Sequence, residues 1–240
     1  MNIIFFGSSS FSVPSLKSIS HFVSCVVTKK PKPKGRGYTL EDNEVKKAAL
    51  ELKLPLIEID SFKDDDAKQI GIYKPELFVV ASFGLIIPKW ALDMPSVGAI
   101  NIHPSLLPKY RGPSPIQWAI LNGDEKTGIT LIKMNERMDE GRIIYQENVE
   151  IKKGENMIAL SERLSQRSSE ILNVVIDSII TQGMMEGTEQ KHEDATYTPI
   201  IRKEMGRINW NGKAAEIINQ VRAFVLWPTA YTYLDSILLK

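Results

Sequence analysis

The chain opens with an apolar strand, a tight turn, a helix and a second strand. Asn2 to Phe6 is a short apolar run, and Gly7-Ser8-Ser9-Ser10 supplies small residues for a turn. Pro14 to Ile19 fits a helix, and Phe22 to Val27 is a second apolar run. This order is typical of the start of a doubly wound α/β fold, whose sheet is mostly parallel.

Later segments extend the same pattern. Leu77 to Ala81 and Val97 to Ile102 are continuous apolar runs, as expected for central strands covered on both faces. We expect further strands at Ile129 to Met134, Ile143 to Val149 and near Tyr231 to Leu239. Apolar spacing predicts helices at Glu44 to Leu52, Ile116 to Leu121, from the N-cap Asn156 to Gly183, and at about Ala214 to Phe224. The polar segment Gly187 to Thr198 is expected to be a linker.

Composition excludes several classes of protein. The formal net charge of the 240 residues is +1, so the whole chain carries no electrostatic signature of a DNA-binding protein. One cysteine, Cys25, rules out an intramolecular disulfide and a Cys-rich metal site, and its apolar surroundings predict an inert buried thiol. No apolar run has membrane-spanning length, and the first residues lack a basic signal region. We therefore expect a cytoplasmic protein that does not associate with membranes.

An amide and an imidazole stand two residues apart at the end of one predicted strand. Asn101 and His103 close the run that begins at Val97, and residues i and i+2 of a strand face the same side. Downstream, Asp139 lies in a loop that ends at Gly141. An Asn, a His and an Asp without a nucleophilic Ser or Cys suit direct acyl transfer to an amine. Taken alone, Asn101 and His103 could also close a loop, and Asp139 could serve as a turn residue.

The segment from Asn101 to Ile116 resembles the signature of the folate-dependent formyltransferases. The residue types, their order and their spacing agree, from Asn-Ile-His-Pro-Ser-Leu-Leu-Pro through Arg111-Gly112-Pro113 to Asp139. The resemblance covers essentially the whole chain. It implies a formyltransferase-type Rossmann-like domain in which Asn101, His103 and Asp139 are catalytic.

The resemblance also implies a reaction and its substrates. A formyl group would pass from 10-formyltetrahydrofolate to a primary amine, without a metal. The expected folate-binding residues share two loops and the segment after His103: Phe83, Gly84, Leu85, Ile86, Ser105, Leu106, Leu107, Pro108 and Asn135. Leu85 and Ile86 would line an apolar slot, while other contacts in this family come from the backbone.

The acceptor side follows from two further segments. The turn at Gly7 and Ser8 lies beside the acceptor in the family that the chain resembles. The basic loop Lys29 to Gly37 resembles the tRNA-end-binding loop of members that formylate methionyl initiator tRNA, so Arg36 is expected to reach the acceptor while lysines contact phosphates. The acidic Thr39 to Asp42 departs from that pattern. Alternatives are an amino-sugar nucleotide as acceptor, a non-catalytic remnant that binds folate, and a hydrolase that releases formate.

The domain plan expected from the resemblance has three parts. Residues 1–186 would form the catalytic domain, 187–206 a linker, and 207–240 the start of a C-terminal domain. In the family, that last domain is a β-barrel of the OB type. We expect only its first helix and strand in this chain, as a short remnant.

Overall fold

The computed structural model describes residues 1–34 and 39–240. The chain divides into two compact units, which are considered separately. The first comprises residues 1–103, 131–145 and 165–190, and the second comprises residues 104–130, 146–164 and 191–240. The predicted boundaries 1–186, 187–206 and 207–240 follow a different division and stay a prediction.

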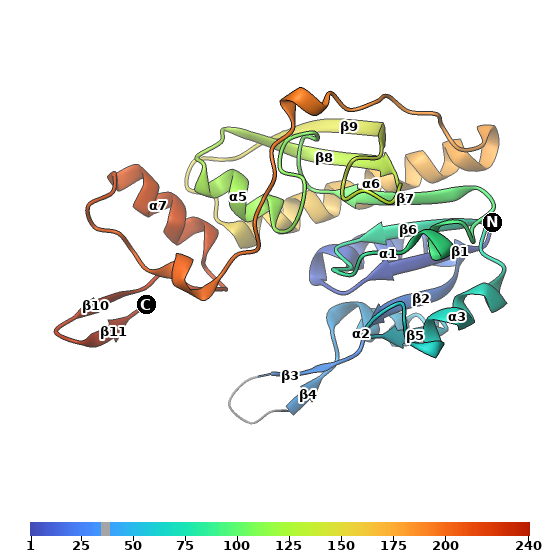
Figure 1. Ribbon diagram of the computed structural model, residues 1–240, viewed down its shortest axis with the longest axis horizontal. Coiled ribbons are helices and arrows are strands. Elements are labelled where there is room, and N and C mark those ends of the chain that lie inside the picture. The colour runs from blue at the N-terminus through green and yellow to red at the C-terminus, as the bar shows by residue number, and fades with distance from the viewer. Residues whose placement is uncertain (35–38) are drawn as a thin grey trace. The chain divides into compact units, whose positions relative to one another are not determined.

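A seven-stranded sheet organises the first unit, in the order β5-β2-β1-β6-β7-β8-β9 (Figure 1). The strands span Ile3–Gly7 (β1), Val23–Lys29 (β2), Leu56–Ile59 (β5), Leu77–Ala81 (β6), Gly98–His103 (β7), Lys126–Lys133 (β8) and Arg142–Glu150 (β9). Pairing is parallel from β5 through β7. Residues 131–133 and 142–145 are the parts of β8 and β9 that belong to this unit. The predicted doubly wound, mostly parallel α/β fold is therefore confirmed.

The helices and the smaller strands complete the element list. Helices span Val13–Ser18 (α1), Glu44–Glu51 (α2), Asp65–Lys68 (α3), Lys89–Leu92 (α4), Pro115–Leu121 (α5), Met157–Gln182 (α6) and Ala214–Ala223 (α7). Short 3-10 helices lie at Ser10–Ser12, Ser20–Phe22, Gln69–Tyr73, His192–Asp194 and Lys203–Gly206. Two antiparallel pairs stand outside the main sheet: β3 (Lys32–Lys34) with β4 (Thr39–Glu41), and β10 (Thr232–Leu234) with β11 (Ile237–Leu239). No helix in the described ranges has both the length and the apolar character to cross a membrane.

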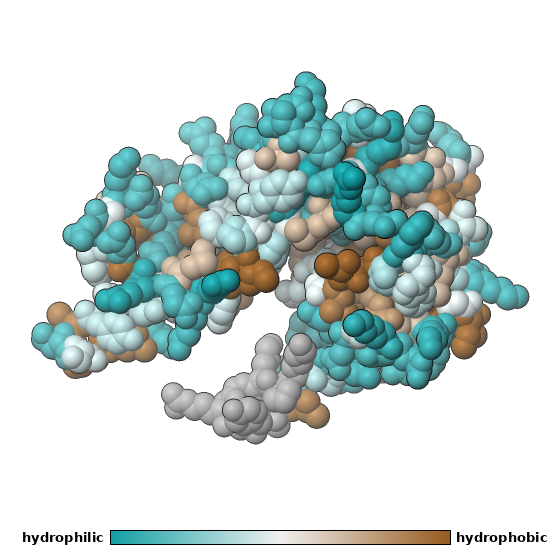
Figure 2. Space-filling view, in the orientation of Figure 1, coloured by the Kyte–Doolittle hydropathy of each residue, from teal (hydrophilic) through white to brown (hydrophobic). Residues whose placement is uncertain are grey.

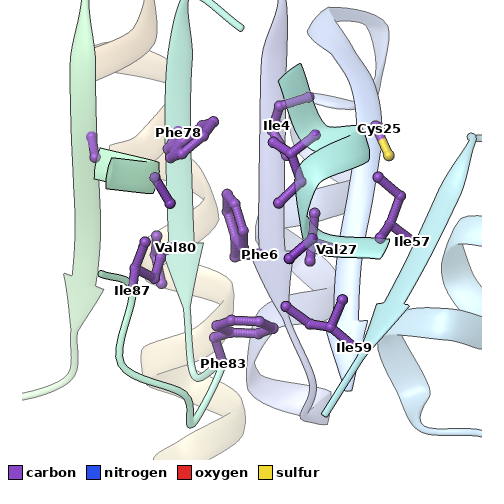
Figure 3. Close-up of a cluster of buried hydrophobic side chains, with 14 residues drawn as sticks. Ile4, Phe6, Cys25, Val27, Ile57, Ile59, Phe78, Val80, Phe83 and Ile87 are labelled. Carbon is purple, nitrogen blue, oxygen red and sulfur yellow. The ribbon is translucent and has the colours of Figure 1, made fainter. Parts of the chain in front are cut away.

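Apolar side chains from neighbouring parallel strands form the core of the first unit (Figure 3). Phe6 of β1 lies at its centre, with ring centroids 4.8 Å from Phe78 of β6 and 5.3 Å from Phe83, both edge to face. Such aromatic pairs stabilise the fold beyond the apolar area that they bury. Cys25 is fully buried in this cluster, as predicted, and burial raises the pKa of its thiol to about 11.

The chain switches sides of the sheet at β1. From β1 it continues to β2 on one side, and later returns to β6 on the other. Just beyond the carboxyl ends of β1 and β6, the Ser9 hydroxyl donates a 2.8 Å hydrogen bond to the Ser82 hydroxyl. Open α/β sheets bind ligands outside the carboxyl ends of their strands at such a switch point. This edge of the sheet is therefore where a site is expected.

The second unit pairs helices α5 and α7 side by side (Figure 1). A single strand was predicted near Tyr231 to Leu239, but this prediction is wrong: Asp235 and Ser236 adopt positive φ angles and turn the chain into the β10–β11 hairpin. The hairpin exposes large apolar side chains, including Leu234, Ile237 and Leu238. Figure 2 shows this apolar character at the surface near β10 and β11.

Candidate active site

The carboxyl end of β7 presents an amide and an imidazole to one side of the sheet. Asn101 pairs in register with Val80, and Ile102 with Ala81, so the end of β7 is a central strand held by β6. His103 follows as the last strand residue and is 4% exposed. The alternation of strand side chains places Asn101 and His103 on one face, as the spacing predicts.

One carboxylate contacts both side chains. Asn101 Nδ2 donates a hydrogen bond to Asp139 Oδ1 at 3.3 Å, and His103 Nδ1 lies 3.6 Å from Asp139 Oδ2. The side chains of His103 and Asp139 are 5% and 13% exposed. The structure thus brings together the three residues that sequence comparison singled out, although 36 positions separate His103 from Asp139.

A tight loop between β8 and β9 carries Asp139. The Asn135 side chain accepts a hydrogen bond from the Arg137 amide at 2.9 Å, which folds the first half of this loop into an Asx turn. Asp139 adopts a positive φ of 55°, a region that Asp tolerates better than most residues. A Cβ on Gly141 would lie 1.9 Å from the Lys133 carbonyl oxygen, so this position requires glycine. Local backbone geometry therefore aims the Asp139 carboxylate at β7.

This arrangement suits a reaction in which an oxygen gains negative charge. The amide N–H of Asn101 and an N–H of His103 are hydrogen-bond donors, which stabilise such a charge when they are held in place in advance. A carboxylate beside His103 orients the ring for proton transfer. In the described part of the chain, no three His, Cys, Asp or Glu side chains gather closely enough to hold a metal ion.

The loop after β6 could contact a ligand through its backbone polar groups and through one exposed apolar side chain. Phe83 is 2% exposed and packs in the core, so at this position the side chain serves the fold. Gly84 has a φ of 74°, and a Cβ there would meet Lys29 Nζ at 2.8 Å. Leu85 packs partly against the core, whereas Ile86 is 81% exposed. Of the expected pair, Ile86 is the one with a large apolar surface available to a ligand.

The turn after β1 is closely packed. A Cβ on Gly7 would lie 2.9 Å from both the Phe5 ring and Ser12, and the Gly7 carbonyl accepts a 2.6 Å hydrogen bond from the Thr28 hydroxyl. The Ser8 hydroxyl accepts from the Lys29 amide at 3.3 Å. Gly7 and Ser8 thus lie at the sheet edge where β1 ends. Arg36, the other expected acceptor residue, lies outside the described residues.

Residues 105–108 belong to the second unit and are held there by the buried Thr130 and by Gln146. The Thr130 hydroxyl donates to the Ser105 carbonyl at 2.6 Å and accepts from the Leu107 amide at 3.2 Å. Gln146 Nε2 donates to the Leu107 carbonyl and to the Thr130 hydroxyl, both at 2.9 Å. The segment Ser105 to Pro108 is therefore a rigid loop, with Leu107 3% exposed.

A model of the family described as formyl transferase matches residues 1–176, and a model of the formyl transferase C-terminal domain matches residues 200–240. The chain belongs to the formyltransferase family. The site built from Asn101, His103 and Asp139 lies within the first of these matches.

Named relatives and a solved structure agree with this membership. The methionyl-tRNA formyltransferase of Thermodesulfovibrio yellowstonii is 43% identical over 238 residues, which cover 98% of this chain and 77% of the relative. That of Alkaliphilus oremlandii is 38% identical over 244 residues, with 100% and 78% covered. The fold matches a sugar N-formyltransferase from a Shewanella species with a TM-score of 0.73 at 22% identity, covering 100% of this chain and 95% of that one.

Sequence reasoning missed several polar contacts that the structure shows within each unit. Gln190 falls in the polar segment expected to be a linker, yet it is 6% exposed and donates to the Asp139 and Gly141 carbonyls, both at 2.7 Å. Thr130 and Gln146 sit in strands predicted only for their apolar neighbours. His192 is exposed, but its Nδ1 lies 3.2 Å from Nη1 of the fully buried Arg111. No spacing signal marks any of these contacts.

Proposed function

We propose that this formyltransferase transfers the formyl group of 10-formyltetrahydrofolate to the amino group of methionyl initiator tRNA. The observation that carries the proposal is the Asp139 carboxylate placed between Asn101 and His103. The acceptor is supported by relatives at 43% and 38% identity that are methionyl-tRNA formyltransferases. Since this acceptor takes part in translation, the proposed reaction is cytoplasmic.

The donor supplies a formyl carbon bound to nitrogen. The neutral acceptor amine attacks this carbon, a new carbon–nitrogen bond forms, and negative charge develops on the formyl oxygen. Asn101 and His103 stabilise that oxygen by donating hydrogen bonds. Asp139 orients the imidazole. As the bond to the donor nitrogen breaks, a proton lost from the attacking amine is delivered to that nitrogen, so no net proton is consumed.

The remaining expected residues complete this proposal. The donor is bound by the backbone of Phe83 and Gly84, by the apolar side chains of Leu85 and Ile86, by the rigid loop Ser105 to Pro108, and by Asn135. The turn at Gly7 and Ser8, together with Arg36, contacts the acceptor. The exposed face of Ile86 supports the donor assignment, because flat ligands bind in largely apolar surroundings.

A direct assay tests the proposal. The protein is incubated with 10-formyltetrahydrofolate and methionyl initiator tRNA, with an amino-sugar nucleotide, or with no acceptor, and N-formyl product and free formate are measured. Formylmethionyl-tRNA as the main product supports the proposal. Efficient formylation of the sugar alone would assign the acceptor to the sugar class, and formate release without an amine would identify a hydrolase. Donor binding without turnover would identify a non-catalytic remnant.

A further inference from the structure

Gln190 is a buried amide whose donors are directed at the loop that carries Asp139. Its side chain is 6% exposed, although it follows a helix and precedes a run of exposed residues. Nε2 donates to the carbonyl oxygens of Asp139 and Gly141, both at 2.7 Å. The two bonded carbonyls lie on either side of Glu140. One side chain thus fixes the backbone just where the Asp139 carboxylate is set.

Backbone hydrogen bonds between the segment before Gln190 and strand β9 hold Gln190 in position. Ile143 and Thr188 exchange two backbone hydrogen bonds of 2.8 Å in an isolated antiparallel bridge. Arg142 Nε donates to the Gly187 carbonyl at 3.1 Å, and a Cβ on Gly187 would lie 2.8 Å from the Ile143 carbonyl oxygen. The segment therefore lies directly against β9, with no room for a side chain at position 187. Gln190 lies two residues after the bridge, within hydrogen-bonding distance of the loop that carries Asp139.

We propose that Gln190 is a positioning residue for formyl transfer: its amide holds Asp139 in the left-handed conformation that directs the carboxylate at Asn101 and His103. This inference rests on the proposed function of the same site. A positive φ at a residue other than glycine persists only when surrounding contacts enforce it. Gln190 supplies such contacts through the backbone carbonyls of Asp139 and Gly141. Without its amide, the loop can relax and the carboxylate can move away from β7.

The first test replaces the amide with an apolar side chain of similar shape. Gln190→Met should lower kcat by about tenfold to a hundredfold, because small displacements of catalytic groups are costly, while the KM for donor and acceptor stays within about twofold. The same chemical change at the exposed Gln182, Gln182→Met, is the matched control and should leave kcat unchanged. Thermal unfolding of both variants reports whether they fold. A folded Gln190→Met protein with normal kcat would overturn the proposal.

A double-mutant cycle separates positioning from a general structural role. If Gln190 acts through Asp139, then adding Gln190→Met to Asp139→Asn should cost at most about twofold more, because residues that act as a unit are non-additive. Should the two losses multiply in full, Gln190 would act by another route, and the proposal would fail.

A spectroscopic measurement judges the inference independently of the acceptor. In isotope-labelled protein, the ¹³Cα and ¹³Cβ shifts of Asp139 report its backbone conformation. Wild type and Gln182→Met should show left-handed values, and Gln190→Met should not. Unchanged Asp139 shifts in Gln190→Met would overturn the positioning role even if the enzyme formylates methionyl-tRNA. Conversely, a changed shift would uphold it even if the acceptor proved to be a different amine.

Discussion

His103 Nδ1 lies 3.6 Å from Oδ2 of Asp139, and both side chains are almost completely buried. At this separation the carboxylate faces the imidazole and fixes the orientation of the ring. The other oxygen of the same carboxylate accepts from Asn101. One acid therefore orients both groups that would face the formyl oxygen.

Removing either donor should disable the reaction. We expect His103→Ala and Asn101→Ala each to lower kcat by about a hundredfold or more, as loss of an oxyanion donor or a general acid–base typically does. Steady-state kinetics with thermal unfolding as a control would measure this. The mechanism fails if a well-folded His103→Ala protein retains near-normal turnover.

Two buried threonines of β8 should respond oppositely to the same substitution. Thr130→Val removes the hydroxyl that bonds Ser105, Leu107 and Gln146, and it should destabilise the fold by about 1–3 kcal/mol because buried partners lose their hydrogen bonds. Thr127 is 2% exposed and its hydroxyl has no hydrogen-bond partner among the described residues, so Thr127→Val should be neutral or stabilising.

Urea denaturation of both variants measures the difference. Because the loop from Ser105 to Pro108 is proposed to bind the donor, Thr130→Val should also weaken donor binding, and Thr127→Val should not. Equal stability changes in the two proteins would show that the Thr130 hydrogen bonds contribute little.

Glycine should be indispensable at position 141. Gly141→Ala would place a methyl group 1.9 Å from the Lys133 carbonyl oxygen, so the backbone must shift. We expect a loss of stability of more than about 2 kcal/mol and reduced kcat, since Asp139 lies two residues away. Gly71→Ala is the control, because its Cβ would meet no atom of residues 1–34 or 39–240 within 4 Å. Wild-type stability and kcat in Gly141→Ala would contradict this account of the loop.

The loss of folding stability at acidic pH should depend on Glu155 in the second unit. Burial raises the pKa of this carboxyl, but hydrogen bonds from Arg163 and from the Lys152 amide outweigh burial and lower it below 4.5. A lowered folded-state pKa means that the stabilisation is present above pH 4.5 and is lost as the pH falls through the folded-state value.

Glu155→Gln should therefore reduce stability at neutral pH and flatten the decline of stability below pH 4.5. Chemical denaturation at a series of pH values measures both effects. Glu162→Gln, at an exposed position on α6 just after Glu155, should change neither. An unaltered acid decline in Glu155→Gln would exclude this ion pair as its source.

Strong periodic signals explain why much of the fold could be predicted. The apolar run Leu77 to Ala81 coincides with β6, and the i, i+2 spacing placed Asn101 and His103 together. On the long helix, the predicted apolar face is buried at Leu164, Ile171, Leu172, Val175, Ile176 and Ile179. Burial imposes these patterns directly, so the sequence displays them.

Other features depend on contacts between distant segments and leave no local pattern. β5 contains only Leu56–Ile59 and lies at the sheet edge, where few apolar residues are required. Gln190 looks like any polar loop residue until the Ile143–Thr188 bridge brings it to Asp139. Such a side chain can be recognised only when its partners, 49 and 51 positions away, are known.

Two separate requirements restrict the residue at position 139: the backbone needs a residue that accepts a positive φ, and the reaction needs a carboxylate. In a saturation library sorted first for folded protein, Asn and Gly should survive beside Asp, because they accept this conformation, whereas Val and Ile should be depleted. A second sort for formyl transfer should then retain Asp. Residues that are present in the first pool and missing from the second satisfy the backbone conformation at position 139 but cannot support formyl transfer.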